Sequence, residues 1–523
     1  MDSTGDGVGD IRGVINRLEY LKGTDTSLGI DAIWFSPIFP SPMADFGYDV
    51  SNYNDIDPLF GSLDDFKELL AKAHAKNICV MVDFVPNHTS DQHPWFKESR
   101  SSKNNTKSDY YVWRDGKADG SPPNNWLSIF GGSAWEYDKN RKQYYLHTFL
   151  KEQPDLDWDN KAVRHEMCKV VRFWLELGVD GIRADAVRWM SKDSQYRDDP
   201  KNPKLDPKNK DEFYSLIHKY SRFGPRLFQY LKELTDVVAQ FDNRIMIFED
   251  YPDGNYSTKE QYMGFYGVDP SVSMPFNFEG LGAPYDAESF QRLVTEFQGM
   301  LNQDIHTPVY CFSNHDNSRI VSRYGREQAR LLALLQITLP GIPVVYYGDE
   351  LGMEDVDIPM NELKDPVELR KPGLGQGRDP ERTPMQWDDS VYAGFSEHKP
   401  WLPVADTINT INVKKELGEA DSYLSLYRRL LGLRNKYEVL RYGDYETFGA
   451  RDVNVMKFAR RLGKNHVYVA LNFSDKTQSV EIPHIGRILC CTHPVDYPDV
   501  SESTVHLRPH EAVLIECIEH PLD

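Results

Sequence analysis

The stretch Gly181-Ile182-Arg183-Ala184-Asp185 ends a short apolar strand with a charged pair. Because successive side chains of a strand point to opposite faces, Arg183 and Asp185 share one face. An arginine two residues before an aspartate can hold the carboxylate ionised and oriented, as a nucleophile or a charge stabiliser requires. A structural ion pair at a strand end explains the same pattern, since ion-pair networks also perturb pKa values. The stretch alone leaves both interpretations open.

Similar β-branched runs recur along the chain and alternate with helical patterns. Apolar residues within 65–77 follow the i, i+3, i+4, i+7 spacing of an amphipathic helix, which predicts a crossover helix between the first two runs. Repetition of strand and helix at this length favours an α/β fold of the (β/α)8 TIM barrel type over an open doubly wound sheet. The runs that predict buried parallel strands cover residues 30–37, 78–85, 179–187, 244–249, 307–312 and 342–347.

Two segments interrupt this alternation and divide the chain into domains. Residues 88–155 lack clean periodicity and exceed an ordinary βα loop, which predicts an inserted subdomain B on the C-terminal face of the barrel. After a helix over 422–434, strand patterns separated by turns predict an antiparallel β domain over 438–523. The discontinuous barrel domain then covers residues 1–87 and 156–437. The predicted strands of the β domain are 453–458, 466–472, 479–482, 487–491 and 512–518.

The composition narrows the class of partners. The net charge of −20 at pH 7 repels phosphate backbones and anionic membrane surfaces, so we expect neither nucleic acid nor a membrane as partner. No apolar run reaches about 18 residues, and no secretory signal is visible. The six cysteines are scattered without a metal-binding spacing, which favours a reduced, cytoplasmic protein.

Polar side chains gather where the predicted strands end, which is where barrel active sites are built. They lie in the segment 83–88, at Asp185, at Glu249 and in the segment 314–316. One such strand end can be a helix cap or a buried pair, but four on one face of a barrel are hard to explain in that way. Three carboxylates with two histidines and an arginine fit the chemistry of glycosidic bond cleavage. The sequence has no glycine-rich loop of the kind that binds phosphate groups, so we expect no organic cofactor.

With these motifs the chain resembles an α-glucosidase of the α-amylase superfamily (glycoside hydrolase family 13), close to the oligo-1,6-glucosidase and maltase groups. The resemblance covers nearly the whole chain. The motifs occur in the family's order: Asp83–His88 (DFVPNH), Gln153–Asp157 (QPDLD), Gly181–Val187 (GIRADAV), Glu249, Asn314–Asp316 (NHD), Gly341–Pro343 with Tyr347–Glu350, and Arg382–Trp387 (RTPMQW). The resemblance implies that Asp185 is the nucleophile, Glu249 the general acid/base and Asp316 the stabiliser of the transition state. The substrate-binding residues it implies are Tyr48, Asp49, His88, Arg183, His315 and Arg382.

These roles predict a retaining mechanism, in which the carboxyl groups of Asp185 and Glu249 lie about 5 to 5.5 Å apart. The resemblance also implies that Asp49 and Arg382 form a pair that closes the pocket behind the non-reducing glucose, with Tyr48 as the platform under that sugar. Arg378 is the competing arginine and ranks second. A closed pocket predicts that one glucose is removed at a time from the end of a short oligosaccharide or a disaccharide.

The opening segment places oxygen-bearing residues at alternate positions, a spacing typical of a loop that binds a hard cation. It is not an EF-hand, because Gly13 stands where the twelfth position requires Glu. In the resembling family this loop holds one structural Ca²⁺ or Mg²⁺ away from the chemistry, and a plain Gly/Asp-rich turn is the alternative. The implied ligands are Asp2, Thr4, Asp6, the Val8 carbonyl and Asp10, with Thr4 in place of the usual Asn.

Two departures from the family pattern matter. The family has a first barrel strand before the cation loop, whereas here Met1 stands directly at the loop, so we expect that strand to be missing and the barrel to have an open edge. Relatives that specialise in α-1,6 linkages carry Val after the nucleophile and QPDLN upstream, whereas this chain has Ala186 and Asp157. Ala186 favours α-1,4 substrates such as maltose, while isomaltose and sucrose stay open.

Two alternatives to hydrolysis remain. Glucosyl transfer or sucrose isomerisation uses the same residues, but the segment 320–325 lacks the charged RLDRD-like run associated with isomerases. A non-catalytic family member, inactivated by N-terminal truncation, is the alternative from another class.

Overall fold

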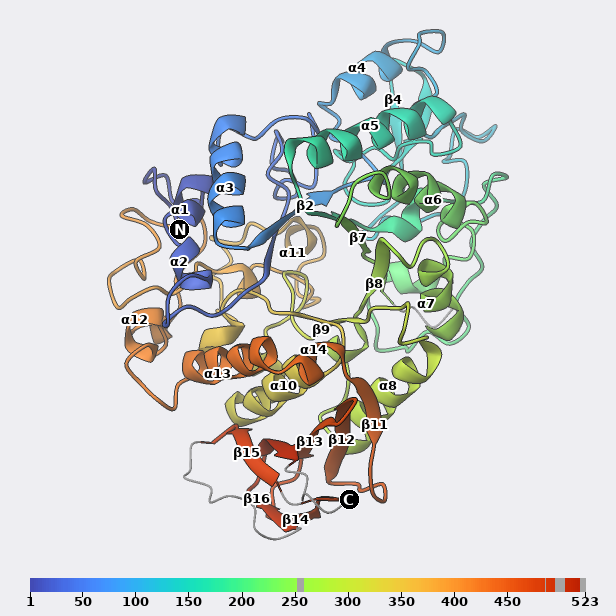
Figure 1. The fold of residues 1–523 in the computed structure, drawn as a ribbon. Helices are drawn as coiled ribbons and strands as arrows, with labels where there is room; N and C mark the ends of the chain where they lie inside the picture. Colours follow the sequence, from blue (N-terminus) through green and yellow to red (C-terminus); the bar gives the residue numbers. More distant parts are fainter. Residues whose placement is uncertain (252–257, 485, 494–503, 518–523) are drawn as a thin grey trace.

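Seven parallel strands form the centre of the computed structural model, which describes residues 1–251, 258–484, 486–493 and 504–517 (Figure 1). They pair in the order β1-β2-β6-β7-β8-β9-β10, so each strand follows its sequence neighbour around the sheet. Their bounds are β1 (Ala32–Phe35), β2 (Cys79–Phe84), β6 (Gly181–Ala184), β7 (Ile245–Phe248), β8 (Ser273–Asn277), β9 (Val309–Cys311) and β10 (Ile342–Val344). The α/β barrel architecture predicted from the alternating pattern is confirmed.

Helices between the strands cover the outside of this sheet, and their ends follow local capping rules. In α3 (Leu63–Ala75), Ser62 and Asp65 form a reciprocal capping box, and Phe66, Leu69 and Leu70 are buried. The other main helices are α5 (Lys161–Leu177), α6 (Leu227–Val238), α7 (Thr258–Tyr266), α8 (Ala287–Met300), α10 (Arg326–Thr338) and α13 (Tyr423–Lys436). Shorter ones are α1 (Ile11–Ile15), α2 (Leu18–Leu21), α4 (Pro94–Ser101), α9 (Ile320–Tyr324), α11 (Pro366–Arg370), α12 (Val413–Glu416) and α14 (Glu438–Tyr442).

The strand β8 is absent from the sequence prediction. Its segment carries Pro275 in the middle. Because proline has no backbone N–H to donate to a neighbouring strand, this sequence does not predict a central strand. In the structure β8 is buried and pairs in parallel with β7 and with β9, where Pro275 faces Phe248. The remaining predicted barrel strands all form.

The sheet has two edges, β1 and β10, which do not pair with each other in the described part of the chain. Both are partly exposed, whereas β6, β8 and β9 are buried along their length. The expected open edge of the barrel is therefore present. Side chains span this opening: the Tyr20 hydroxyl donates to Glu350 at 2.8 Å, and the Arg17 guanidinium lies 4.3 Å from the centre of the Trp387 ring.

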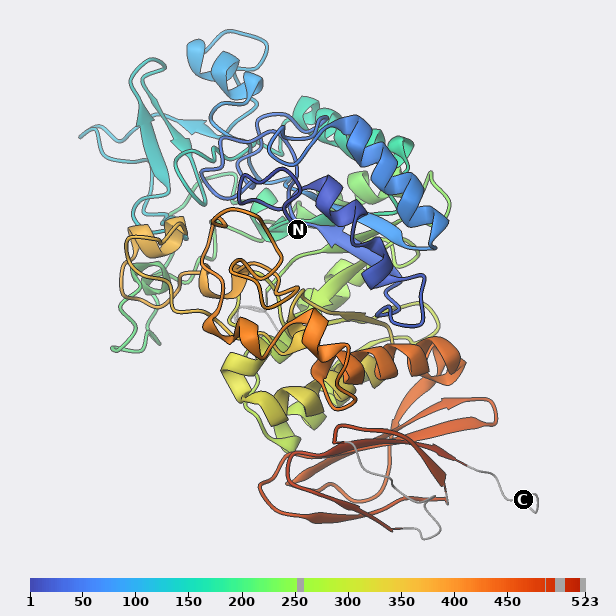
Figure 2. The same ribbon diagram turned by 90° about the vertical axis from the view of Figure 1, so that its left-hand side faces the viewer.

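The two additions lie at opposite ends of the molecule (Figures 1 and 2). The inserted segment holds α4 and a small antiparallel sheet of β3 (Trp113–Arg114), β5 (Gln143–Leu146) and β4 (Trp135–Asp138). The C-terminal domain has a five-stranded sheet, β11-β12-β13-β17-β15, and a two-stranded sheet, β14-β16. Their bounds are β11 (Asp444–Thr447), β12 (Val455–Leu462), β13 (Asn465–Asn472), β14 (Gln478–Glu481), β15 (Gly486–Cys491), β16 (Thr504–Leu507) and β17 (Ala512–Cys517). Of these, β11 and β16 were not predicted.

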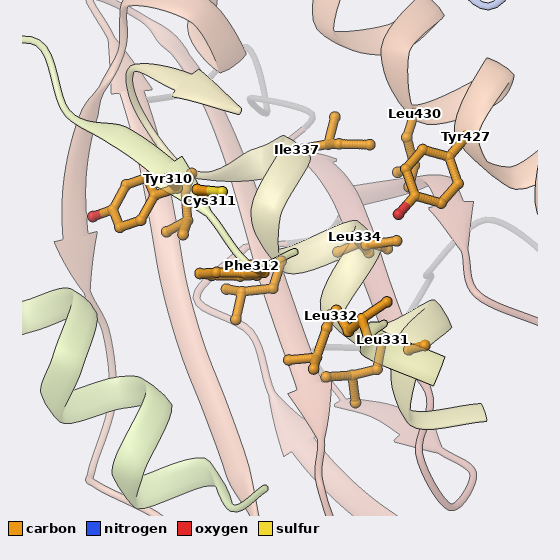
Figure 3. Packing of buried hydrophobic residues seen from close by; sticks show 14 of the residues in the cluster. Tyr310, Cys311, Phe312, Leu331, Leu332, Leu334, Ile337, Tyr427 and Leu430 are labelled. Carbon is orange, nitrogen blue, oxygen red and sulfur yellow. The ribbon is translucent and has the colours of Figure 1, made fainter. Parts of the chain in front are cut away.

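The C-terminal domain shares a core with the barrel. Phe458 of β12 and Leu514 of β17 belong to the same buried cluster as the helices α10 and α13 and the strand β9. Figure 3 shows part of this cluster, with Phe312 beside the leucines of α10. Burial of this many apolar side chains against the barrel fixes the domain in place.

Candidate active site

Arg183 is the centre of the site and is 2% exposed. Its Nη1 atom donates to Asp185 Oδ1 at 2.6 Å and to Asp83 Oδ1 at 3.0 Å, while its Nη2 atom lies 2.9 Å from Glu249 Oε2. The register of three neighbouring strands produces this grouping, because Arg183 of β6 lies opposite Asp83 of β2 and Ile247 of β7. One guanidinium therefore holds three carboxylates in fixed positions.

The Asp185 and Glu249 carboxyls are both bound to the Arg183 guanidinium. Burial raises the pKa of Glu249 to about 8 and that of Asp185 to about 7, and Arg183 opposes both shifts. Both carboxyls therefore hold a proton more tightly than free acids do, and the two groups titrate as a coupled pair. The Glu249 carboxylate also accepts a hydrogen bond from the Ala186 backbone N–H at 2.7 Å, and Ala186 adopts a left-handed conformation with φ of 46° to supply it. A buried glutamic acid with a raised pKa can keep its proton near neutral pH, which a general acid requires.

The third carboxylate, Asp316, is held ionised by two arginines. Its Oδ1 atom accepts from Arg382 Nη2 at 2.9 Å and from Arg378 Nη1 at 3.3 Å. Burial alone would raise the pKa of Asp316, but the neighbouring positive groups outweigh it and the pKa falls below its usual value. Burial lowers the pKa of His315 to about 3, so this ring is neutral at pH 7 and the arginines supply the charge.

Tyr48 and the two histidines line the same site. The Tyr48 hydroxyl donates to Asp83 Oδ2 at 3.1 Å and lies 2.9 Å from His315 Nε2, and the two rings are stacked. His88 Nε2 lies 3.1 Å from the Tyr48 carbonyl oxygen, and burial lowers the pKa of His88 to about 4. Five of the predicted side chains, Tyr48, Arg183, Asp185, Glu249 and His315, thus form one connected network. Neutral imidazoles beside carboxylates can hydrogen bond to sugar hydroxyls without adding charge.

Asp49 does not form the implied pair with Arg382. Its carboxylate is fully buried and accepts hydrogen bonds from the Ser41 hydroxyl and from the backbone N–H groups of Ala44 and Asp45, each at 3.0 Å. Arg382 instead binds Asp316 and the His315 carbonyl. Asp49 therefore stabilises the conformation of the loop over residues 41–45 through these hydrogen bonds.

The competing arginine forms the bridge instead. Arg378 Nη2 donates to Asp45 Oδ1 at 2.9 Å and to Asp365 Oδ1 at 2.8 Å, while its Nη1 atom reaches Asp316. Asp45, four residues before Asp49, supplies the carboxylate that links this loop to Asp316 through an arginine.

In the predicted cation loop, the aspartate side chains accept hydrogen bonds from backbone N–H groups of the same loop. Asp2 accepts from the backbone N–H groups of Thr4, Gly5 and Gly7 and from the Ser396 hydroxyl, and Asp10 accepts from Ser3 and Gly13. Asp6 accepts from the N–H of Val8, whose carbonyl was the fourth implied ligand. Within the described residues no three acidic, histidine or cysteine side chains gather as a metal site. Hydrogen-bond donors of the loop already contact most of these carboxylate oxygens, and the cation site stays a prediction.

Three further residues belong to the site. The sequence analysis ranked Arg378 second and assigned no role to Asp83 or Tyr251. Asp83 begins the DFVPNH motif, and strand alternation places it on the face of Arg183, which is the signal that identifies it. Tyr251 follows Glu249 by two residues, after the end of β7, and its hydroxyl accepts a hydrogen bond from Asn314 Nδ2 at 2.9 Å. Asp250 lies on the other side, bound to Arg188 and Gln261.

A parallel barrel with three carboxylates held by arginines at the ends of its strands is typical of enzymes that cleave or transfer glycosidic bonds. The alpha-amylase catalytic domain family matches residues 1–443, and the chain belongs to this family. The chain is 38% identical to the oligo-1,6-glucosidase of Parageobacillus thermoglucosidasius, over 98% of this chain and 95% of that protein. It is also 38% identical to the alpha-glucosidase of Apis mellifera, over 93% of this chain and 85% of that protein. The crystal structure of the alpha-glucosyl transfer enzyme XgtA superposes with a TM-score of 0.90 at 35% identity, covering 99% of this chain and 97% of the other.

No described helix is long and apolar enough to cross a membrane.

Proposed function

We propose that the protein is a retaining α-glucosidase that releases glucose from the non-reducing end of short glucosides such as maltose. The observation that carries the proposal is the grouping of the Asp185 and Glu249 carboxyls on one arginine, Arg183, with Asp316 held by two further arginines in the same site. The relatives named above, an oligo-1,6-glucosidase and an alpha-glucosidase, support hydrolysis of α-glucosides as the activity.

In the first step Asp185 attacks the anomeric carbon while Glu249 gives its proton to the leaving oxygen. Arg183 keeps the attacking oxygen anionic and aimed, since it binds Asp185 Oδ1 directly. In the second step Glu249, now ionised, takes a proton from water, which displaces the sugar from Asp185 with net retention. Asp316, ionised between Arg378 and Arg382, places negative charge beside the oxocarbenium-like transition state.

The non-catalytic alternative receives no support from the site. Asp185, Glu249 and Asp316 are all in place, and each is held by at least one arginine.

Product analysis tests the proposal. Purified protein is incubated with maltose, isomaltose, sucrose and trehalose to identify the products. The anomer is followed by NMR before mutarotation on p-nitrophenyl α-glucoside, whose leaving group is not glucose. We expect α-glucose from this substrate, and no turnover by Asp185→Asn. Initial release of β-glucose from it would exclude the retaining mechanism, and unchanged activity of Asp185→Asn would exclude this nucleophile.

Glucosyl transfer is the second candidate, because the superposed enzyme XgtA is named for that reaction. The two activities share the first step and differ in whether water or a sugar hydroxyl resolves the intermediate. The same incubations at high maltose concentration separate them, since transfer yields trisaccharides and hydrolysis yields glucose alone.

A further inference from the structure

Arg378 contacts three separate segments of the chain, one of which carries Asp316. Its Nη1 atom donates to Asp316 Oδ1 at 3.3 Å and its Nη2 atom donates to Asp45 Oδ1 at 2.9 Å. Its guanidinium also lies 5.3 Å from the centre of the Phe130 ring. Asp316 lies in the loop after β9, Asp45 in the loop after β1, and Phe130 in the inserted segment. The direction of the Arg378 side chain therefore affects how Asp316 is held.

A fourth segment binds Arg378 through both oxygens of one carboxylate. Asp365 Oδ2 accepts hydrogen bonds from the Arg378 backbone N–H at 2.6 Å and from its Nε atom at 3.0 Å, and Asp365 Oδ1 accepts from Nη2 at 2.8 Å. Asp365 is 0% exposed, so water does not compete for these contacts. A two-point contact between a carboxylate and a planar guanidinium fixes the plane of the guanidinium as well as its position.

The backbone of Asp365 is fixed in turn by the residue after Arg378. Asp379 Oδ2 accepts the backbone N–H groups of Lys364 at 2.6 Å and of Asp365 at 2.9 Å, and Asp379 is also buried. The two segments therefore bind each other reciprocally. The Asp365 side chain accepts from Arg378, and the Asp379 side chain accepts from the backbone at Asp365. These contacts restrict the position of Asp365 relative to Arg378.

Asp316 depends on its arginines for orientation more than the other two carboxyl groups of the site do. Its side chain is 24% exposed, against 10% for Asp185 and 8% for Glu249. Arg378 and Arg382 both bind Oδ1 of Asp316. A carboxylate that is bound by arginines through one oxygen turns when those donors move, and its second oxygen turns with it.

Asp365 also caps the short helix α11, since its Oδ1 atom accepts the Val367 N–H at 3.1 Å. The cap alone does not require a carboxylate, because asparagine caps a helix equally well. The contact with Arg378 does require one, because an asparagine side chain has only one acceptor oxygen for the two guanidinium donors. The two roles can therefore be separated by one substitution.

We propose that Asp365 is a positioning residue for the reaction: it orients the Arg378 guanidinium, which in turn holds Asp316 beside the sugar. This inference rests on the proposed function and extends it to a residue outside the carboxylate trio and its direct partners. It predicts that Asp365 and Arg378 act as one unit, so the effects of changing them are not additive.

A double-mutant cycle with p-nitrophenyl α-glucoside as substrate tests the inference. Asp365→Asn keeps the helix cap and removes the two-point contact, whereas Arg378→Lys keeps the positive charge and removes the same contact from the other side. We expect each substitution to lower kcat/KM by about 10-fold. The double variant should also lose about 10-fold, because the contact is already absent in either single variant.

Asp286→Asn is the matched control, because Asp286 caps α8 by accepting the Ser289 N–H at 2.7 Å. This variant also exchanges a capping aspartate for asparagine, and its kcat/KM should stay within about 2-fold of the wild type. Circular dichroism and thermal melts of all variants show whether each one is folded.

Each outcome decides the inference. A loss in the double variant that is clearly smaller than the product of the two single losses supports it. A loss equal to that product or greater overturns it, because the two residues then act independently. Asp365→Asn with a kcat/KM within about 2-fold of the wild type also overturns it, since an orienting contact would have been lost without effect.

If Asp365→Asn does not fold, Arg378→Lys decides the question, because it retains the charge and loses only the two-point contact. A loss of about 10-fold in this variant supports the inference, and activity within about 2-fold of the wild type overturns it. Wild-type protein that cleaves neither maltose nor the nitrophenyl substrate overturns the proposed function and the inference together. An active wild type isolates a failure to Asp365.

Discussion

Replacement of Glu249 by glutamine should make the protein more stable than the wild type at alkaline pH. The substitution keeps the shape of the side chain and an oxygen that can accept the Ala186 N–H, but it removes the ionisable group. Glu249 has a pKa raised from 4.5 to about 8, chiefly by burial. A carboxyl whose pKa is raised on folding binds more protons in the folded state, so stability falls as pH rises from about 4.5 to about 8.

The size of the effect follows from that shift. A rise from 4.5 to about 8 corresponds to about 5 kcal/mol at about 1.36 kcal/mol per pKa unit. Arg183 loses its Glu249 partner in the variant, which offsets part of this gain, so we expect about 2 to 5 kcal/mol above pH 8. With an unfolding entropy of about 2.1 cal/mol/K per residue, a chain of 523 residues changes its Tm by about 1 °C per kcal/mol. Glu249→Gln should therefore melt about 2 to 5 °C above the wild type at pH 9 and equally at pH 5.

Thermal melts at a fixed scan rate from pH 5 to pH 9 provide the assay. Glu176→Gln, a change at an exposed glutamate, serves as the matched control and should follow the wild type throughout. If Glu249→Gln and the wild type lose stability in parallel across this range, Glu249 does not carry a raised pKa and the acid role loses its physical basis.

Three further predictions follow from the site and the core. The kcat/KM on p-nitrophenyl α-glucoside should fall above about pH 8 as Glu249 loses its proton, and a flat profile to pH 10 would contradict the assignment. Arg183→Lys should lower kcat/KM by about 100-fold or more with an unchanged circular dichroism spectrum, because a point charge cannot hold three carboxylates; a loss below about 10-fold would argue against the hub role. Phe458→Ala, in the core shared by the β domain and the barrel, should cost about 3 to 5 kcal/mol and lower the Tm by about 3 to 5 °C, whereas a shift below about 1 °C would show that the two domains are not coupled there.

The sequence was sufficient for the barrel and for the residues that meet at its C-terminal end. Apolar runs that are buried on both faces predict parallel strands, and the ends of parallel strands in a barrel converge, so Asp185 and Glu249 could be brought together by reasoning alone. The strand β8 escaped because Pro275 breaks the pattern on which the prediction depends. The short strands β11 and β16 lack a run long enough to stand out.

The sequence could not predict which aspartate of the site pairs with which arginine. The loop around Tyr48 contains both Asp45 and Asp49, and the family resemblance implied Asp49 as the partner of an arginine. Phe46 and Gly47 have φ angles of 49° and 97°, a left-handed turn that reverses the chain between the two aspartates. That turn sends Asp49 inward to the loop backbone and leaves Asp45 to meet Arg378. Backbone conformation of this kind is set by tertiary contacts and carries only a weak local signal.

The shared guanidinium of Arg183 also has a consequence for inhibitors. At about pH 8, Asp83 is ionised and the Asp185 and Glu249 pair carries at least one further negative charge, against the single positive charge of Arg183. The cavity at the anomeric centre is therefore electrically negative before any ligand arrives. A sugar mimic with a protonated ring nitrogen brings its own compensating charge into this buried cluster, whereas a neutral mimic of the same shape brings none. We therefore expect the site to bind basic iminosugars more tightly than neutral sugar analogues. The difference should be largest at a pH where the ring nitrogen is still protonated and the carboxyl pair has begun to ionise, because one arginine cannot neutralise three carboxylates.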